Sequence, residues 1–144
     1  MQQQAAIKET SNSVNGIDMD ILQTTIQAVA DEPELGQCQF RASNVWNGGS
    51  QNTTTIRGFY GARQEHTHKD EFVFLADEPT ILAGYDEGAN PVQYLLHALA
   101  GCVTTTMVAH GAVRGINIES ISSELEGDIN LNGFFGIDPD MPKG

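Results

Sequence analysis

The stretch NPVQYLLHALAGCVTTTMVAHGAV, from Asn90 to Val113, decides the fold. Its 24 residues include no Asp, Glu, Lys or Arg. Asn90 is a preferred helix N-cap residue, and Pro91 stands at the first helical position, where a missing N–H is harmless. Arg114 and Gly115 suit the last turn and its C-cap. The stretch therefore predicts one long helix, buried on most sides.

An uncharged run of this length is also typical of a membrane span. Its polar residues and glycines argue against a span, because they lower the hydropathy that insertion requires. They are Gln93, His97, the threonines at 104–106, His110, Gly101 and Gly111. We expect a central helix of a protein core, and no membrane partner.

Upstream, the sequence predicts a flexible N-terminus over residues 1–16 and then a helix. Asp18 suits the N-cap of a helix running to about Ala30, and Pro33 follows its end. Three strands come next, because residues 37–46 alternate polar and apolar and the other two segments are rich in Thr and in aliphatic and aromatic residues. The predicted strands are 37–46, 53–60 and 71–76, with a turn at 47–50.

Downstream of Gly115, apolar residues take odd positions and polar or acidic residues take even ones. The apolar residues are Ile121, Leu125, Ile129 and Leu131. This period of two predicts a strand over 121–131 with one buried face, followed by a loop over 133–144. The chain is thus predicted to be α+β, with helices packed against an antiparallel sheet in one domain over 17–144.

The charge balance excludes several classes of partner. The formal net charge is −12 and the seven Lys and Arg residues are scattered, so neither nucleic acid nor an anionic membrane surface fits. Residues 1–8 lack the basic and apolar regions of a signal peptide. We expect a cytoplasmic protein, in which the two cysteines, Cys38 and Cys102, form no disulfide framework.

The segment from Asn90 to Cys102 resembles the central-helix signature of the OsmC/Ohr family. Further matches are Asp77-Glu78-Pro79, Arg114-Gly115-Ile116 and Leu125-Glu126-Gly127-Asp128. The resemblance spans roughly residues 37 to 140. It implies an intertwined homodimer in which two antiparallel sheets wrap two long, buried central helices.

The same resemblance implies a chemistry. Members of the family reduce organic hydroperoxides through a cysteine on this helix, which corresponds to Cys102. An external dithiol such as a lipoyl group regenerates the thiol, and no bound cofactor is implied.

Three departures from the family pattern bear on that activity. Val92 and Gln93 stand where peroxidase members carry a glutamate. The family arginine is missing both after the glycine pair, where Ser50 stands, and from the strand predicted at 71–76. The resolving cysteine and the closing strands would lie beyond Gly144, which implies a shortened version of the domain or a fragment of it.

A peroxidatic cysteine must be a thiolate, and an ordinary thiol has a pKa of about 8.5. A position in the middle of a helix gains little from the helix dipole, so a cation is needed, and Arg57 and Arg63 are the candidates. Leu95, Leu99 and Thr106 share the predicted face of Cys102 and are candidate substrate-binding residues. The competing interpretation is that Cys102 is a small buried hydrophobe, whose pKa burial would raise.

Other polar clusters have plainer interpretations. His66 and His68 would point to one side of a strand, but without a third histidine nearby we predict no metal site. The acidic residues at 77, 78, 86 and 87 are interpreted as solvated loop caps.

Two functions follow as hypotheses. The first is a thiol peroxidase acting on organic hydroperoxides. The second is a non-catalytic OsmC-fold protein that binds an apolar small molecule in the dimer cleft. Fold resemblance alone does not choose between them.

Overall fold

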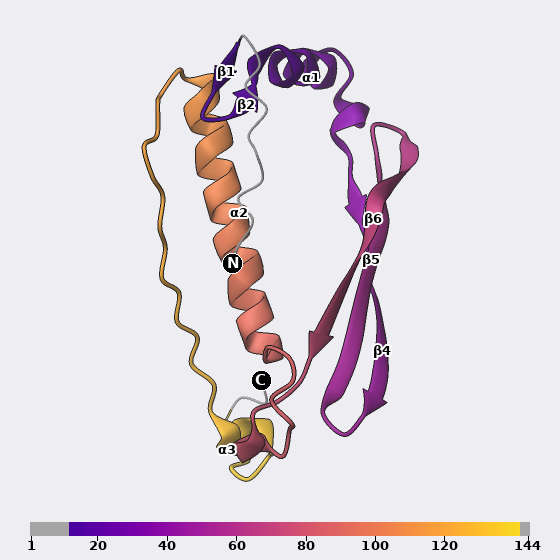
Figure 1. Cartoon of the computed structure of the whole chain (residues 1–144), viewed down its shortest axis with the longest axis vertical. Coiled ribbons are helices and arrows are strands. Elements are labelled where there is room, and N and C mark those ends of the chain that lie inside the picture. The colour runs from indigo at the N-terminus through magenta and orange to yellow at the C-terminus, as the bar shows by residue number, and fades with distance from the viewer. Residues whose placement is uncertain (1–11, 142–144) are drawn as a thin grey trace.

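The computed structural model describes residues 12–141, and its elements form an open frame (Figure 1). The long helix runs along one side, the sheet along the other, and the first helix crosses above them. In chain order the elements are β1 (Ser13–Val14), β2 (Ile17–Asp18), α1 (Met19–Asp31), the 3-10 turn η1 (Pro33–Gly36), β3 (Gln39–Phe40), β4 (Ser43–Gly48), β5 (Gln51–Gly61), β6 (Gln64–Ala76), the 3-10 turn η2 (Thr80–Leu82), α2 (Pro91–Val113) and α3 (Leu131–Phe134). The predicted α+β class is confirmed.

The sheet is built around β5. β6 pairs with one edge of β5, and β3 and β4 pair with the other, all antiparallel. The turn predicted at 47–50 joins β4 to β5 as expected. The register shifts between Ile56 and Gly58, where β6 carries extra residues opposite Arg57.

Two strand predictions need correction. The segment 37–46 is not one strand, because the chain leaves the sheet at Arg41–Ala42 between β3 and β4. β6 starts at Gln64, well before the predicted residue 71. Its polar first half alternates weakly, and it is a strand because it pairs with β5 across a tight turn, a contact that composition does not encode.

Both predicted helices are confirmed with their N-caps. The Asp18 carboxylate accepts hydrogen bonds from the amides of Asp20 and Ile21 and so starts α1. α2 has the predicted bounds. Residues 12–16, placed in the flexible N-terminus by sequence, form β1 and the turn into β2, while residues 1–11 of that prediction lie outside the described part.

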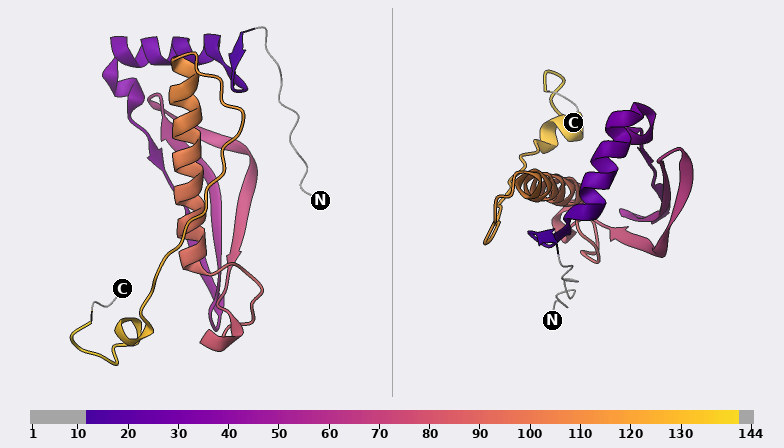
Figure 2. Two further views of the ribbon diagram at one scale, coloured as in Figure 1. Left: turned by 90° about the vertical axis from the view of Figure 1, so that its left-hand side faces the viewer. Right: turned by 90° about the horizontal axis from the view of Figure 1, so that it is seen from above.

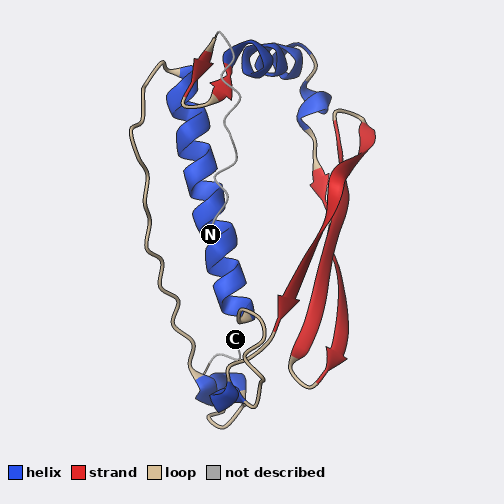
Figure 3. Ribbon diagram, in the orientation of Figure 1, coloured by secondary structure: helices blue, strands red, loops and turns tan. Residues whose placement is uncertain are grey.

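The strand predicted over 121–131 is wrong for the single chain. Residues 116–130 are extended but carry no regular secondary structure (Figure 3). Their backbone has no neighbouring strand within residues 12–141, so the alternating pattern has nothing to pair with. The loop predicted after residue 133 is also interrupted, since α3 begins at Leu131, with the Asn130 side chain accepting from the amide of Asn132.

The single chain has almost no core. Met19, Ala76 and Ala112 are the apolar residues buried in the described part. α2 is not buried as predicted, because a stripe of apolar residues along it is exposed. Its members are Leu95, Leu99, Val103 and Met107, each between 47% and 69% exposed. Viewed from above, α2 stands apart from the sheet (Figure 2).

The accessible surface measures this shortfall. The chain exposes 11634 Å², whereas a compact monomer of 15.5 kDa exposes roughly 7,200 Å². The fourteen residues outside 12–141 supply at most about 2,200 Å² of the excess, even at the unfolded-chain value. About 2,200 Å² of surface in the described part is therefore uncovered.

α2 also has the length and composition of a membrane-spanning helix. Within residues 12–141 it is the one helix that does. One such helix is weak support for a span, because the core helix of a soluble protein has the same composition.

A buried carboxylate fixes the loop that leads from β6 into α2. Asp77 is fully buried and accepts hydrogen bonds from the Ser50 hydroxyl at 2.6 Å and from the Gln51 amide at 3.2 Å. The backbone amides of Glu78, Tyr85 and Glu87 also donate to it. The interpretation of Asp77 as a solvated cap is wrong, since it ties this loop to the β4–β5 turn.

These hydrogen bonds set the ionisation of Asp77. The bond from Ser50, with those from the backbone and Gln51, holds the pKa of Asp77 far below its ordinary value, although burial acts in the opposite direction. Because the folded-state pKa is depressed, Asp77 stabilises the fold above the unfolded-state pKa of about 3.9. That contribution declines as the pH falls below about 4 toward the folded-state value.

We expect Asp77→Asn to lower the free energy of unfolding at neutral pH, because the amide places a donor among donors. The difference from wild type should narrow as the pH falls below about 4, where the wild-type carboxylate loses its advantage. Urea unfolding at several pH values measures this. Asp86→Asn, an exposed change on the same loop, is the control, and a pH-independent difference for Asp77→Asn would contradict the account.

Candidate functional site

The N-terminus of α2 is held by a complete capping box. The Asn90 side chain accepts a hydrogen bond from the amide of Val92 at 2.8 Å, and the Gln93 side chain accepts from the amide of Asn90 at 2.9 Å. The Asn90 amide group also donates to the Glu78 carboxylate. The start of α2 is thus tied to the loop that Asp77 organises.

One contact region joins α2 to the sheet near this end. The Tyr94 hydroxyl donates to the carbonyl of Leu75 at 2.7 Å, and its ring meets Phe74 edge to face at 6.1 Å between centroids. A hollow of about 410 Å³ lies between this part of α2 and strands β5 and β6. Ile56, Phe74 and Ala98 are among its apolar walls.

Cys102 lies in the middle of α2 and is exposed in the single chain. The neighbouring Gly101 leaves open space, since a Cβ built on it would meet nothing within 4 Å. Leu95 and Leu99 are 69% and 51% exposed, and Thr106 is exposed too. The thiol and its predicted apolar neighbours therefore form an open surface along the helix.

The two candidate arginines lie on the sheet side of the molecule. Arg57 lines a shallow hollow together with Arg41, Glu65 and Glu71. Arg63 forms an ion pair with Glu32 and approaches Glu34 at 3.8 Å. Within residues 12–141, no hydrogen bond or ion pair joins either guanidinium to Cys102.

An aromatic cluster on the sheet escaped the sequence analysis. Phe59 stacks on Phe40 at 5.2 Å and on His66 at 4.9 Å, and it meets His68 at 5.4 Å. The two histidines share one side of β6, as their spacing predicts, but their rings pack against aromatic side chains. No group of three metal-binding residues occurs within residues 12–141.

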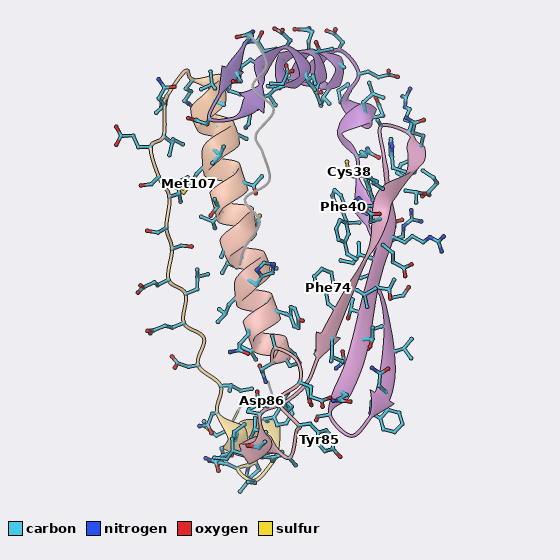
Figure 4. All side chains as sticks on the ribbon, viewed as in Figure 1. Cys38, Phe40, Phe74, Tyr85, Asp86 and Met107 are labelled. Carbon is cyan, nitrogen blue, oxygen red and sulfur yellow. The ribbon has the colours of Figure 1, made fainter. Side chains whose placement is uncertain are left out.

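The cluster faces the long helix. Phe40 and Phe74 both lie on the side of the sheet toward α2 (Figure 4). Phe40 is 73% exposed, so this apolar face is uncovered like the stripe on α2. The alternation at 38–46 gave part of this signal, but the contribution of β6 required the true start of that strand.

Comparison with known families identifies the second half of the chain. Residues 84–141, which contain α2, the extended segment and α3, match the family model described as OsmC-like protein. Over this segment the chain is similar to OsmC-like proteins. The match includes Asn90 and Cys102 but neither Arg57 nor Arg63. No curated protein matches the chain significantly.

The capping box provides a direct test of how α2 is anchored. Asn90→Ala should lower the free energy of unfolding by about 1 kcal/mol, because it removes the acceptor at the N-cap. Asn90→Ser keeps an acceptor there and should recover most of that loss. Thermal and urea unfolding report both values, and a serine variant no more stable than the alanine variant would show that the cap contributes little.

Proposed function

We propose that this OsmC-like chain forms a homodimer that reduces organic hydroperoxides, with Cys102 as the peroxidatic thiol. The observation that carries the proposal is the exposed thiol of Cys102 in the middle of the family-matched helix, beside Gly101 and an apolar stripe. A nucleophilic thiol must be reachable by its substrate. An apolar surface beside it favours an organic peroxide over hydrogen peroxide.

The uncovered surface supports a second copy as the partner. About 2,200 Å² per chain, counted on both partners, gives an interface of about 4,400 Å², within the range of obligate dimers. The apolar stripe on α2 and the aromatic face of the sheet are of the kind that such interfaces bury. A monomer would leave both in water.

The extended segment 116–130 supports an intertwined form of that dimer. Its residues 119–129 make no backbone hydrogen bond within residues 12–141, and Ile121 and Leu125 are half-buried along it. β6 pairs with β5 along one edge, and in the described part its other edge is bridged only at Ala76, to Ala89, so a long free edge remains. An exchanged segment pairing with that edge would satisfy both sets of backbone groups and cover an exposed edge.

In the proposed reaction, Cys102 first reduces the peroxide and is then regenerated by an external dithiol. The Cys102 thiolate attacks the distal peroxide oxygen, a sulfur–oxygen bond forms, and the oxygen–oxygen bond breaks. The leaving alkoxide takes a proton and departs as an alcohol, while Cys102 becomes a sulfenic acid. An external dithiol, such as a dihydrolipoyl group, then attacks the sulfenic sulfur, releases water, and closes its own disulfide to restore the thiol.

The thiolate needs a cation that the single chain does not bring to it. In the proposed dimer the guanidinium comes from the partner copy. Arg57 suits this role better than Arg63, because Arg63 is engaged by Glu32 and Arg57 makes no ion pair within residues 12–141. Proximity to a guanidinium would lower the thiol pKa and orient the peroxide.

A second candidate function rests on the hollow beside Tyr94. It is apolar, measures about 410 Å³, and has no arginine or lysine among its lining residues. A site of that character suits an apolar small molecule held without chemistry at Cys102. This alternative is a binding protein of OsmC fold with the ligand in the dimer cleft.

Peroxide consumption separates the two functions. With cumene hydroperoxide and dihydrolipoamide, we expect turnover by the wild type, loss of turnover to background in Cys102→Ser, and near-normal turnover in Cys38→Ser. Cys38 is exposed but lies just before β3, outside α2. A folded dimer with no turnover would leave the binding function as the one supported.

The apolar stripe tests the dimer independently of activity. Met107 is 51% exposed in the single chain, so Met107→Glu is tolerated there but would bury an unpaired charge in the interface. We expect sedimentation equilibrium to give twice 15.5 kDa for the wild type and association at least about 100-fold weaker for the variant. Gln23→Glu, exposed on α1, is the matched charge control. Equal association of all three chains would contradict the dimer.

A further inference from the structure

A second cavity lies at the N-terminal end of α2, away from Cys102. It measures about 650 Å³ and is enclosed by three segments distant in sequence: the loop after β6, the first turns of α2, and the stretch around α3. Of the α2 residues that line the cavity, Leu96 is the nearest in sequence to Cys102 and precedes it by six residues. That is about 9 Å along the helix axis and about 120° around it. The cavity therefore opens on another face from the thiol.

The walls of this cavity are built tightly. On the loop, a Cβ on Gly84 would stand 1.7 Å from the carbonyl oxygen of Glu78, and one on Gly88 would stand 2.5 Å from that of Leu75. A side chain at either position would therefore clash with the backbone, and buried Asp77 also holds this loop. On the opposite wall, Gly127 approaches Leu96, whose side chain would lie 3.4 Å from an added Cβ.

The cavity is apolar and ends in an aromatic pair. Phe134 and Phe135 meet edge to face at 5.1 Å between centroids, and each is 60% exposed. Leu131 and Pro91 extend the same apolar surface. The hollow has the size of a ligand site, and a ligand that covers these exposed rings would bind favourably because it removes their apolar surface from water.

Two carboxylates give the cavity its charge. Glu78 and Asp86 both line it, and no Lys, Arg or His is among its lining residues. Asp86 has a φ of 60° in the tight loop, next to the lower end of α2 (Figure 4). Glu78 is half-buried and accepts from Asn90, which holds its carboxylate in place. The two carboxylates repel an anionic ligand and attract a cationic one.

We propose that this cavity binds an organic cation with an aromatic or bulky apolar body, such as an aromatic amine or a quaternary ammonium compound. The apolar body lies against Phe134, Phe135 and Leu131. The cationic group lies at the acidic rim, where Glu78 and Asp86 attract it, and it approaches an aromatic face as cations do. A bare metal ion does not fit, because the apolar walls would strip its water without supplying oxygen ligands.

The test compares two probes of the same shape that differ in charge. Benzyltrimethylammonium and neopentylbenzene are isosteric, and only the first is a cation. Titration of the full chain by calorimetry and by amide NMR should show at least tenfold tighter binding of benzyltrimethylammonium. The shifted amides should be those of Gln93, Leu96, Phe134 and Phe135. Equal binding of the two probes, or no binding of the cation at millimolar concentration, would overturn the proposal.

Variants of matched shape test which carboxylates bind the cation. Glu78→Gln with Asp86→Asn keeps the shape of both side chains and should weaken cation binding at least tenfold. Asparagine also tolerates the positive φ at position 86. Glu87→Gln changes a carboxylate of the same loop outside the cavity and should leave binding unchanged. Circular dichroism verifies that each variant is folded.

The outcome does not depend on the peroxidase function. Cys102→Ser should bind benzyltrimethylammonium as the wild type does, because the thiol is on another face of α2. Undiminished binding in the Glu78/Asp86 double variant would contradict the assigned site. So would loss of binding in Cys102→Ser.

Discussion

Within residues 12–141, the largest apolar surfaces are not covered by the chain itself. α2 presents a stripe from Leu95 to Met107, and the sheet presents Phe40 and its aromatic neighbours, with little between them. A protein of this size normally buries about two thirds of its unfolded surface, and this frame falls well short. In the proposed dimer a second copy would supply the missing core, and the site around Cys102 would be complete only in that assembly.

Within the single chain, hydrogen bonds between polar groups, rather than an apolar core, hold the structure together near the N-terminus of α2. Buried Asp77 ties the loop after β6 to the β4–β5 turn, and Asn90 links the end of that loop to α2. A buried charged or polar group is stable only if it is hydrogen-bonded. Asp77 accepts five hydrogen bonds. This rigid corner positions the start of α2 and shapes the cavity at its N-terminus.

The sequence predicted what local chemistry determines. The caps at Asp18 and Asn90, the bounds of α2 and the turn after β4 follow from residues adjacent in the chain. The start of β6 and the state of 116–130 depend on distant partners, so composition misplaced the start of β6, and alternation predicted a strand at 121–131 that the single chain does not form. The exposure of Cys102 likewise depends on what packs against α2. The surroundings of Arg57 and Arg63 depend on which distant segments pair in the sheet.

Hydrogen–deuterium exchange across residues 119–129 in the native protein measures most directly whether a second copy pairs with this segment. We expect the amides there to be as protected as those of β5, and we expect that protection to be lost when the protein is diluted until it dissociates. Rapid exchange of these amides in a folded chain, at concentrations where β5 remains protected, would show that the segment pairs with nothing. It would then contradict completion of the fold by strand exchange with a second copy.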